Sequence, residues 1–318
     1  MSADPLATVW VILRDVCFPI LSVIGLGWYF DRRFRLDLET LVKLNIYLFV
    51  PAFIFVRVTN SEVATGLGLL IVGFTITMIG SMGFLSLLLA KLRGYSTEHK
   101  RTLLLTSMFY NSGNYGIPLT ALAFPEFGPG VQVFVLMTMN IATFSLGLML
   151  ATAEPCPKNK SLRLSLGPVF RQPSLYAIFT AIGLKLADFP IAEVVFIWKP
   201  AEFLADALVG LALVTLGVQL SKTKRSEFRG PLVWALSIRL LAGPVCALIL
   251  VGIFRFEPAI AAVLIIGSAA PTAVNTALLA HEFDADSQTA AAAVFYSTLL
   301  SFIPVAALLF WIRLSWNL

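Results

Sequence analysis

Long apolar stretches dominate this chain and leave it few ways to fold. A membrane-crossing helix needs about 20 mostly apolar residues, and ten stretches qualify. They run over residues 8–30, 40–60, 64–90, 102–124, 131–152, 173–190, 200–220, 231–254, 258–281 and 288–312. In hydrocarbon every backbone N–H and C=O must find a partner inside the protein. We therefore predict an all-α integral membrane protein with ten transmembrane helices.

The composition agrees with a chain that is mostly dissolved in lipid. Only 13% of the residues are charged and 58% are hydrophobic, whereas soluble domains carry roughly 25% charged residues. The longest connection between apolar stretches is about 20 residues, too short for a soluble domain. The net charge of +5 does not indicate nucleic-acid binding, because its distribution has a simpler cause.

Basic residues gather in every second loop. Loops 31–39, 91–101, 156–172 and 221–230 together hold fifteen Lys or Arg residues. The alternating loops hold only Arg57, Lys185, Lys199 and Arg255. Short loops rich in Lys and Arg stay in the cytoplasm. We therefore expect a multi-pass protein of the plasma membrane with both termini on the outer side.

The ten stretches divide into two sets of five at loop 153–172. We expect a first repeat over 1–152, a cytoplasmic inter-repeat loop over 153–172, and a second repeat over 173–318. A faint similarity between the halves recurs at a spacing near 162 residues, where Ile76 and Arg93 fall on Ile238 and Arg255. Because five is an odd number, the second repeat enters the membrane from the opposite side, which makes the repeats inverted.

Two of the apolar stretches contain helix-breaking polar segments near their midpoints. The fourth reads Asn-Ser-Gly-Asn-Tyr-Gly-Ile-Pro over 111–118, and the ninth reads Gly-Ser-Ala-Ala-Pro-Thr-Ala-Val-Asn-Thr over 267–276. Prolines also occur in other stretches, so one break alone would be structural as readily as functional. Two breaks at matching positions of two repeats predict a solute site of a secondary transporter.

These motifs resemble the auxin efflux carrier family. The resemblance rests on Asn111-x-x-Asn114-x-Gly116-x-Pro118-Leu119, on Ala270-Pro271-x-x-x-Asn275, and on residues 216–220 and 239–244, and it covers essentially the whole chain. The short central loop is similar to that of the bacterial branch, which includes malonate and malate permeases and lies in the inner membrane. Here Ser112 and Gly113 stand between the two asparagines, where plant members have proline.

The resemblance implies the inverted-repeat fold of sodium/proton antiporters and bile-acid transporters. In that fold helices 4 and 9 are broken and cross at their prolines. Helices 1, 2, 6 and 7 form a scaffold, while helices 3–5 and 8–10 form a mobile transport unit. The resemblance further implies alternating access by an elevator-like motion, and a homodimer is one arrangement compatible with it.

The candidate substrate-binding residues follow from the chemistry of a broken helix. Free N–H groups at unwound helix ends favour anions, and Asn amides can hydrogen-bond either a carboxylate or freed backbone groups. The candidates at the two breaks are Asn111, Asn114, Tyr115, Pro118, Pro271 and Asn275, and two more are Gln219 near the end of the seventh stretch and Arg239 inside the eighth. Asn114 and Asn275 are predicted to contact the solute and Asn111 to cap broken backbone. Arg239 either attracts an anion or ties down carbonyls freed at the second break.

Other charged residues give weaker indications. Asp206 and Lys43 are candidates for an ion or proton site, but their position near the membrane interface favours an ion pair across the scaffold. Asn45 and Asn140 are polar residues inside apolar stretches, where helix–helix hydrogen bonds are common. A cluster of His281, Glu282, Asp284 and Asp286 lacks a metal-loop pattern. We predict no metal site and no cofactor, and expect Asp286 to cap the last helix.

The function that these features predict is transport of a small organic anion, auxin-like or a dicarboxylate such as malonate or malate. The partners are then this solute, the lipid bilayer, and protons or sodium if transport is coupled. No nucleic acid is expected. An enzyme is disfavoured because no catalytic motif is visible. The alternative within transport is a sodium/proton-type antiporter of the same fold, which would require a carboxylate beside the breaks.

Overall fold

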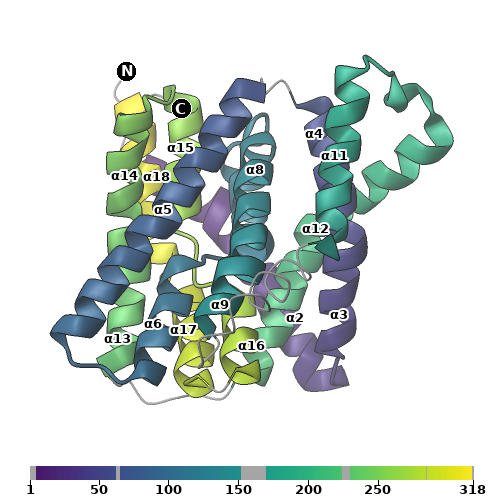
Figure 1. Ribbon diagram of the computed structural model, residues 1–318. Helices are drawn as coiled ribbons and strands as arrows, with labels where there is room; N and C mark the ends of the chain where they lie inside the picture. Colours follow the sequence, from purple (N-terminus) through teal and green to yellow (C-terminus); the bar gives the residue numbers. More distant parts are fainter. Residues whose placement is uncertain (1–4, 62–64, 152–169, 224–229, 284, 317–318) are drawn as a thin grey trace, which may run out of the picture.

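The computed structural model describes residues 5–61, 65–151, 170–223, 230–283 and 285–316. This part of the chain is helical throughout, with one isolated β-bridge and no sheet (Figure 1). Most of the expected inter-repeat loop 153–172 lies outside the described residues, as does Asp284. The prediction of an all-α protein is confirmed for the described part.

Six helical stretches are long and apolar enough to cross a membrane, and a seventh follows if α17 (Ser287–Leu300) and α18 (Phe302–Trp316), bent by 40°, count as one. The six are Pro5–Phe34, Leu38–Asn60, Gly66–Leu92, Gly128–Ala151, Val195–Lys222 and Gly230–Phe254. The apolar helices α11 (Pro173–Leu186) and α15 (Pro258–Ser268) are shorter. The chain is therefore a multi-pass membrane protein.

Several of these stretches are built from consecutive segments. Four stretches are segmented: α1 (Pro5–Ile12), η1 (Leu13–Cys17) and α2 (Phe18–Phe34); α3 (Leu38–Leu44), η2 (Asn45–Phe49) and α4 (Val50–Asn60); α8 (Gly128–Ala142), η4 (Thr143–Gly147) and α9 (Leu148–Ala151); and α13 (Gly230–Ser237), η6 (Ile238–Ala242) and α14 (Gly243–Phe254). The other two stretches are the single helices α5 (Thr65–Leu92) and α12 (Val195–Lys222). The short turn η5 (Ile191–Glu193) joins α11 to α12.

Two helices are interrupted where the sequence has its polar breaks. The first consists of α6 (Thr97–Met108), a break over 109–111, the turn η3 (Ser112–Gly116) and α7 (Ile117–Ala123). The second consists of α15, a break over 269–273 and α16 (Val274–Glu282). The first break begins two residues before the predicted polar segment, and the second falls inside its predicted segment.

Prolines account for most of the wide helical turns. The turns η1, η2, η3 and η6 have π-helical geometry, and each ends two residues before a proline. These prolines are Pro19, Pro51, Pro118 and Pro244. Proline lacks an N–H and its ring clashes with the carbonyl four residues earlier, so the preceding turn must widen or break. The chain thus encodes these distortions locally.

The helices pack in two groups (Figure 1). In one group α12 packs against α2 and α4, and α4 packs against α11. In the other, α5 contacts α6, α8 and α14, and α13 to α18 complete the bundle. The α2–α12 contact is close because of two glycines: an added Cβ on Gly217 would lie 2.1 Å from the Ile24 carbonyl oxygen. On Gly27 it would lie 2.4 Å from that of Val214.

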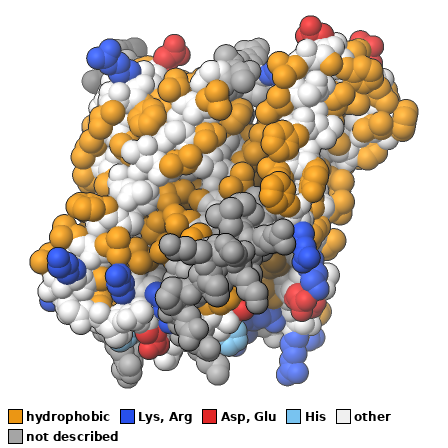
Figure 2. Space-filling model, viewed as in Figure 1, with side chains coloured by type: hydrophobic (Ala, Val, Ile, Leu, Met, Phe, Trp, Pro, Cys, Tyr) orange, Lys and Arg blue, Asp and Glu red, His pale blue; other side chains and the backbone are white. Residues whose placement is uncertain are grey.

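The surface agrees with a bilayer environment. Large apolar side chains such as Leu69, Phe84 and Phe196 are exposed, and the face in Figure 2 is largely hydrophobic, with charged side chains at its two ends. Both termini lie at one end of the molecule, opposite the connections after α2 and α5 (Figure 1). Those connections carry Arg35 and Arg93.

Candidate functional site

The two helix breaks lie directly against each other. Tyr110 and Thr272 form an antiparallel bridge. The Asn111 N–H donates to the Pro271 carbonyl at 2.7 Å, and the Ala273 N–H donates to the Phe109 carbonyl at 2.9 Å. Each break therefore supplies the backbone partners that the other has lost, which is what an unwound segment inside a membrane protein needs.

Arg239 of η6 hydrogen-bonds to both helix ends that enter the crossing. Its guanidinium donates to the Ser107 carbonyl at 2.9 Å and to the Ser268 carbonyl at 2.6 Å. These carbonyls belong to the last turns of α6 and α15, which carry the partial negative charge of the helix dipole. The guanidinium also lies over the Tyr110 ring at 4.9 Å, and the side chain is fully buried. This placement matches the structural alternative for Arg239.

Side chains satisfy further groups at the crossing. The Thr272 hydroxyl donates to the Thr106 carbonyl at 2.8 Å, and the Ser297 hydroxyl accepts the Thr272 N–H at 3.0 Å. The Gln132 amide donates to the Ser112 carbonyl at 2.9 Å from α8. Buried backbone groups in native proteins are nearly always paired, and here both breaks meet that requirement through hydroxyl and amide side chains.

Asn111 and Asn114 form a small network at the start of η3. The Asn111 carbonyl oxygen Oδ1 accepts the Asn114 N–H at 3.0 Å, so Asn111 caps this turn as predicted. The Asn114 Oδ1 accepts from Asn45 Nδ2 at 3.0 Å. Asn45 belongs to η2 and thus to the other helix group. This hydrogen bond joins the broken helix to its neighbour across the two groups.

A cavity of about 70 Å³ opens beside the crossing. Its apolar wall includes Val42, Ile46, Val50, Leu136, Met139 and Val274. Its polar side chains are Asn45, Asn111, Ser112, Asn114, Asn140, Thr143, Ser174 and Asn275. None of the described residues that line it is charged. Because η2 and α11 contribute from one helix group and η3, α8, η4 and α16 from the other, the cavity lies between the two groups.

The electrostatics of the crossing are asymmetric. The first turns of η3 and of α16 border the cavity through Ser112, Gly113, Val274 and Asn275. Helix N-termini carry partial positive charge, which remains at η3 although its Ser112 and Asn114 N–H groups pair with Tyr110 and Asn111. The opposite helix ends, in α6 and α15, are already neutralised by Arg239. The cavity thus combines positive helix ends with amide and hydroxyl side chains, a combination suited to a small anion.

The structure separates the candidate residues into two sets. Asn111, Asn114 and Asn275 line the cavity. Outside its lining lie Tyr115, Pro118, Pro271, Gln219 and Arg239. Tyr115 is fully buried, accepts a hydrogen bond from the Ser301 hydroxyl at 3.0 Å and packs against Phe302.

The expected ion pair between Lys43 and Asp206 does not form. Lys43 instead contacts Glu39 one helical turn away at 2.5 Å, and Asp206 contacts Arg57 at 3.2 Å. Glu39 and Lys43 are neighbours on one helix face, so this pairing is the easier one to form. Neither Lys43 nor Asp206 lines the cavity.

The sequence alone did not identify some residues of the cavity and the crossing. Gln132 lies between the two broken helices, because an added Cβ on Gly116 of η3 or on Gly267 of α15 would lie 2.4 Å or 3.1 Å from the Gln132 amide group. Thr143 and Ser174 line the cavity without any motif around them. The available signal for Gln132 was a glutamine inside an apolar stretch of the sequence, because such residues need polar partners, and the structure buries it fully.

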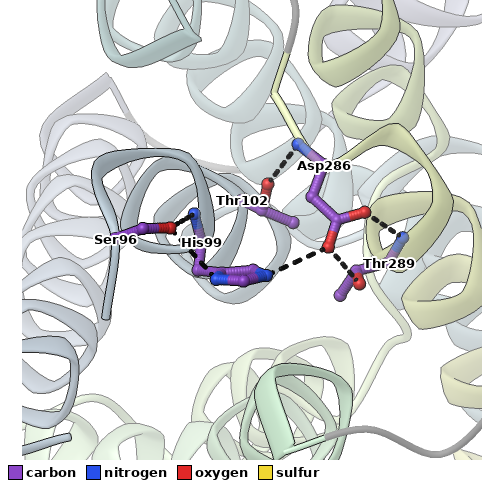
Figure 3. A network of polar contacts seen from close by, with 5 residues as sticks. All are labelled: Ser96, His99, Thr102, Asp286 and Thr289. Atoms are coloured by element: carbon purple, nitrogen blue, oxygen red, sulfur yellow. Dashed lines mark hydrogen bonds and ion pairs between the residues drawn. The ribbon is translucent and has the colours of Figure 1, made fainter. Parts of the chain in front are cut away.

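Asp286, one member of the acidic cluster after α16, caps a helix. Asp286 accepts the Thr289 N–H at 2.9 Å, which confirms the predicted cap of α17. Its own N–H donates to the Thr102 hydroxyl at 3.0 Å, and His99 lies 3.7 Å from its carboxylate (Figure 3). Ser96 caps α6 beside His99. Within the described residues, no group of His, Cys, Asp and Glu could hold a metal ion.

Known proteins with similar sequences carry transporter names. The chain is 29% identical over 318 residues to an uncharacterized transporter of Methanocaldococcus jannaschii, covering 96% of this chain and all of the relative. It is 23% identical over 318 residues to a candidate malonate transporter of Rhizobium meliloti, covering 95% and 96% of the two chains. A family model described as "Membrane transport protein" matches residues 15–310. The chain therefore belongs to this membrane transport protein family, as its resemblance to auxin efflux carriers predicts.

Proposed function

We propose that the protein carries a small organic carboxylate anion across the membrane, with the solute bound in the cavity at the crossing. The observation that carries this proposal is the charge arrangement. Two helix N-termini border the cavity, while Arg239 neutralises the two opposing helix C-termini on the other side of the crossing. A carboxylate is the common biological group that such a small, positive and otherwise uncharged site favours.

Asn114 and Asn275 are the residues that we expect to contact the solute, with Asn111 both capping η3 and reaching the cavity. Their amides can donate to carboxylate oxygens without introducing a fixed charge. A site without fixed cations binds an anion weakly enough to release it, as a transport cycle requires. The Rhizobium meliloti relative, by its name a candidate malonate transporter, supports a small dicarboxylate as the first solute to test.

The transport mechanism that we infer is alternating access by relative motion of two helix groups. The group with α2, α4, α11 and α12 would serve as scaffold, and the group that holds both breaks would carry the solute. A cavity walled by both groups is the arrangement in which such a motion exposes the site to either side. The Asn45–Asn114 hydrogen bond is then one of the contacts that the motion breaks.

The proposed topology has ten crossings arranged as two inverted five-helix repeats. The pairs α6/α7 and α15/α16 would each make one broken crossing, and α11 would make a short one. The basic connections after α2 and α5 lie away from both termini, which supports termini on the outer side of the plasma membrane. The cavity then lies nearer the cytoplasmic side, because it borders α3, η4 and the start of α11.

A sodium/proton-type antiporter of the same fold is the competing function. It would need an ionisable carboxylate beside the crossing. Asp206 pairs with Arg57 away from the cavity, and the described cavity lining holds no Asp or Glu. The observations therefore favour the anion over the cation.

Uptake into proteoliposomes tests the proposal. Purified protein is reconstituted, and the initial uptake of labelled malonate, malate, succinate and indole-3-acetate is measured with and without proton and sodium gradients. Asn114→Ala should reduce uptake at least tenfold, whereas Asn60→Ala, at an exposed asparagine on the end of α4, should leave it unchanged. Absence of uptake for every acid, with cation exchange instead, would establish the competing function.

A further inference from the structure

An apolar groove lies on the outer surface of the helix bundle, separate from the cavity at the crossing. It measures about 330 Å³, and α5, α6, η4 and α9 contribute its lining: Gly80, Gly83, Phe84, Leu87, Leu104, Met108, Leu146 and Leu150. None of these residues lines the crossing cavity. Phe84, Leu87 and Leu146 are exposed, whereas Leu104 and Met108 are buried. The groove therefore has a buried floor and opens to the surroundings of the protein.

Two glycines of α5 shape the groove. An added Cβ on Gly83 would lie 3.1 Å from the Met108 side chain, so α5 and α6 approach closely at the floor. On Gly80 an added Cβ would meet no described atom within 4 Å, although Gly80 belongs to the lining. The groove is thus narrow at its floor and open above Gly80.

The groove has the length of one leaflet of the bilayer. It begins at Leu87, one helical turn before Lys91 at the basic end of α5, and reaches Gly80. Residues 80 to 91 cover roughly 16 Å along the helix axis at about 1.5 Å per residue. Half of the hydrocarbon core of a bilayer is about 15 Å thick. A lipid acyl chain of one leaflet therefore matches the groove in length and in polarity.

Two lysines follow the groove at its basic end. Lys91 comes four residues after Leu87 on α5, and Lys100 comes four residues before Leu104 on α6. Residues four apart share a helix face, so each lysine continues a face that lines the groove. Both lysines are exposed and form no ion pair within the described parts of the chain. Figure 2 shows Lys and Arg side chains at this end of the face.

Arg101 adds a third positive charge at the same end. Its guanidinium donates to the last carbonyl of α9 at 2.7 Å, directly after Leu150 of the groove lining. Arg93 of the same connection is instead held over the Trp234 ring of α13, outside the lining. Glu98 is the one acidic residue of the sequence segment 91–101. The groove thus ends in a basic cluster of Lys91, Lys100 and Arg101.

We propose that this groove is a binding site for a phospholipid with an anionic headgroup. One acyl chain would lie along Gly80 and Leu87, and the headgroup would lie in the basic cluster. Basic clusters at the membrane ends of helices attract anionic headgroups. A second copy of the chain docked through the same face would bring two basic clusters together, which their repulsion disfavours. The inference goes beyond the proposed transport activity and does not depend on the identity of the solute.

The size of the lipid preference follows from the charges. One basic residue near an anionic lipid contributes about fivefold in affinity. With Lys91 and Lys100 both facing the headgroup, we expect an anionic lipid to be preferred over a neutral one by about tenfold or more at low salt. The preference should decrease as salt screens the charges.

Native mass spectrometry of the delipidated full-length protein tests the site. The protein in detergent is mixed with equal amounts of phosphatidylglycerol and phosphatidylcholine that carry the same acyl chains, and the ratio of the two singly bound species is measured. The wild-type ratio should favour phosphatidylglycerol about tenfold, and free glycerol phosphate at the same concentration should not displace the lipid. A ratio near one, or displacement by glycerol phosphate, would overturn the proposal.

Variants separate the headgroup from the acyl chain. Lys91→Gln combined with Lys100→Gln should bring the ratio to within twofold of one, whereas Arg93→Gln should keep the wild-type ratio. Gly80→Leu fills the groove and should lower the binding of both lipids several-fold. Gly252→Leu is its control, because Gly252 is another exposed glycine whose added Cβ would meet nothing within 4 Å.

The two sets of variants can each contradict the proposal. An unchanged ratio in the double lysine variant would remove the headgroup from the basic cluster. Equal lipid binding by Gly80→Leu and Gly252→Leu would remove the acyl chain from the groove. If Gly80→Leu does not fold, the double lysine variant still decides, because both changes are at exposed side chains.

Discussion

Replacing Arg239 by methionine should destabilise the protein, because it removes the hydrogen bonds that hold both helix ends at the crossing. Methionine keeps an unbranched side chain but removes the donors to the Ser107 and Ser268 carbonyls. Both carbonyl oxygens would then be buried with weaker partners or none. Arg239 is fully buried and lies outside the cavity lining, so the first effect should appear in stability.

The magnitude follows from three contacts. A hydrogen bond involving a charged group contributes about 1.5–3 kcal/mol, and there are two. A desolvated cation–π contact, here with Tyr110 at 4.9 Å, adds about 2 kcal/mol. Removing the guanidinium also removes the cost of burying it, which offsets part of the loss. We expect a net loss of about 3–5 kcal/mol, the range typical of breaking a buried charged pair.

The assay is thermal unfolding of the detergent-solubilised protein followed by intrinsic fluorescence. A loss of this size should lower the apparent Tm by about 5–10 °C. Arg93→Met is the matched control, because Arg93 lies over the Trp234 ring at 4.7 Å but at the exposed end of α5. Arg239→Lys, which keeps a charge and three donors, should fall between methionine and wild type.

The opposite pattern would refute this account of Arg239. If Arg239→Met left the apparent Tm within 1–2 °C of wild type while raising the KM for the transported acid, the arginine would be holding solute rather than carbonyls. A drop in Tm equal to that of Arg93→Met would show that the ring contact, not the tie between helix ends, accounts for the effect.

Three further substitutions test other contacts by thermal unfolding. Gly217→Ala should lower the apparent Tm strongly, because its Cβ would lie 2.1 Å from a backbone oxygen. Gly210→Ala is the control, because its Cβ would meet nothing within 4 Å. Equal decreases in Tm for the two variants would argue against close α2–α12 packing. Asp286→Ala should cost about 1 kcal/mol through the lost α17 cap, and an unchanged Tm would discount the cap. Gln132→Leu should cost about 1–3 kcal/mol by freeing the Ser112 carbonyl, and a gain in stability would contradict its role.

Local sequence rules identified the parts of this fold that depend on nearby residues. Pro118 and Pro271 with their flanking glycines and asparagines mark both breaks, because proline removes a backbone donor wherever it stands. The Asp286 cap was equally readable, since the capping oxygen and the N–H that it accepts are three residues apart. The apolar stretches were readable because lipid leaves the backbone few alternatives.

Contacts between distant segments were not readable in this way. The choice of Arg57 rather than Lys43 as the partner of Asp206 depends on how α4 meets α12. Likewise, the first helix ends at Met108, before the polar segment, because the backbone of 109–111 pairs with the second break. Such pairings are set by tertiary packing, and a single sequence does not reveal which of several polar partners will meet.

The central claim is that the transported solute occupies the cavity between the two helix groups. A single cysteine at Asn140→Cys, a partly exposed cavity residue, would be placed in a transport-competent background with Cys17, Cys156 and Cys246 changed to serine. The rate of its alkylation by a small maleimide is then measured with and without the transported acid, beside Lys100→Cys at an exposed position. Saturating acid should slow alkylation of Asn140→Cys several-fold and leave that of Lys100→Cys unaffected. Equal rates with and without an acid that the same variant transports would contradict it.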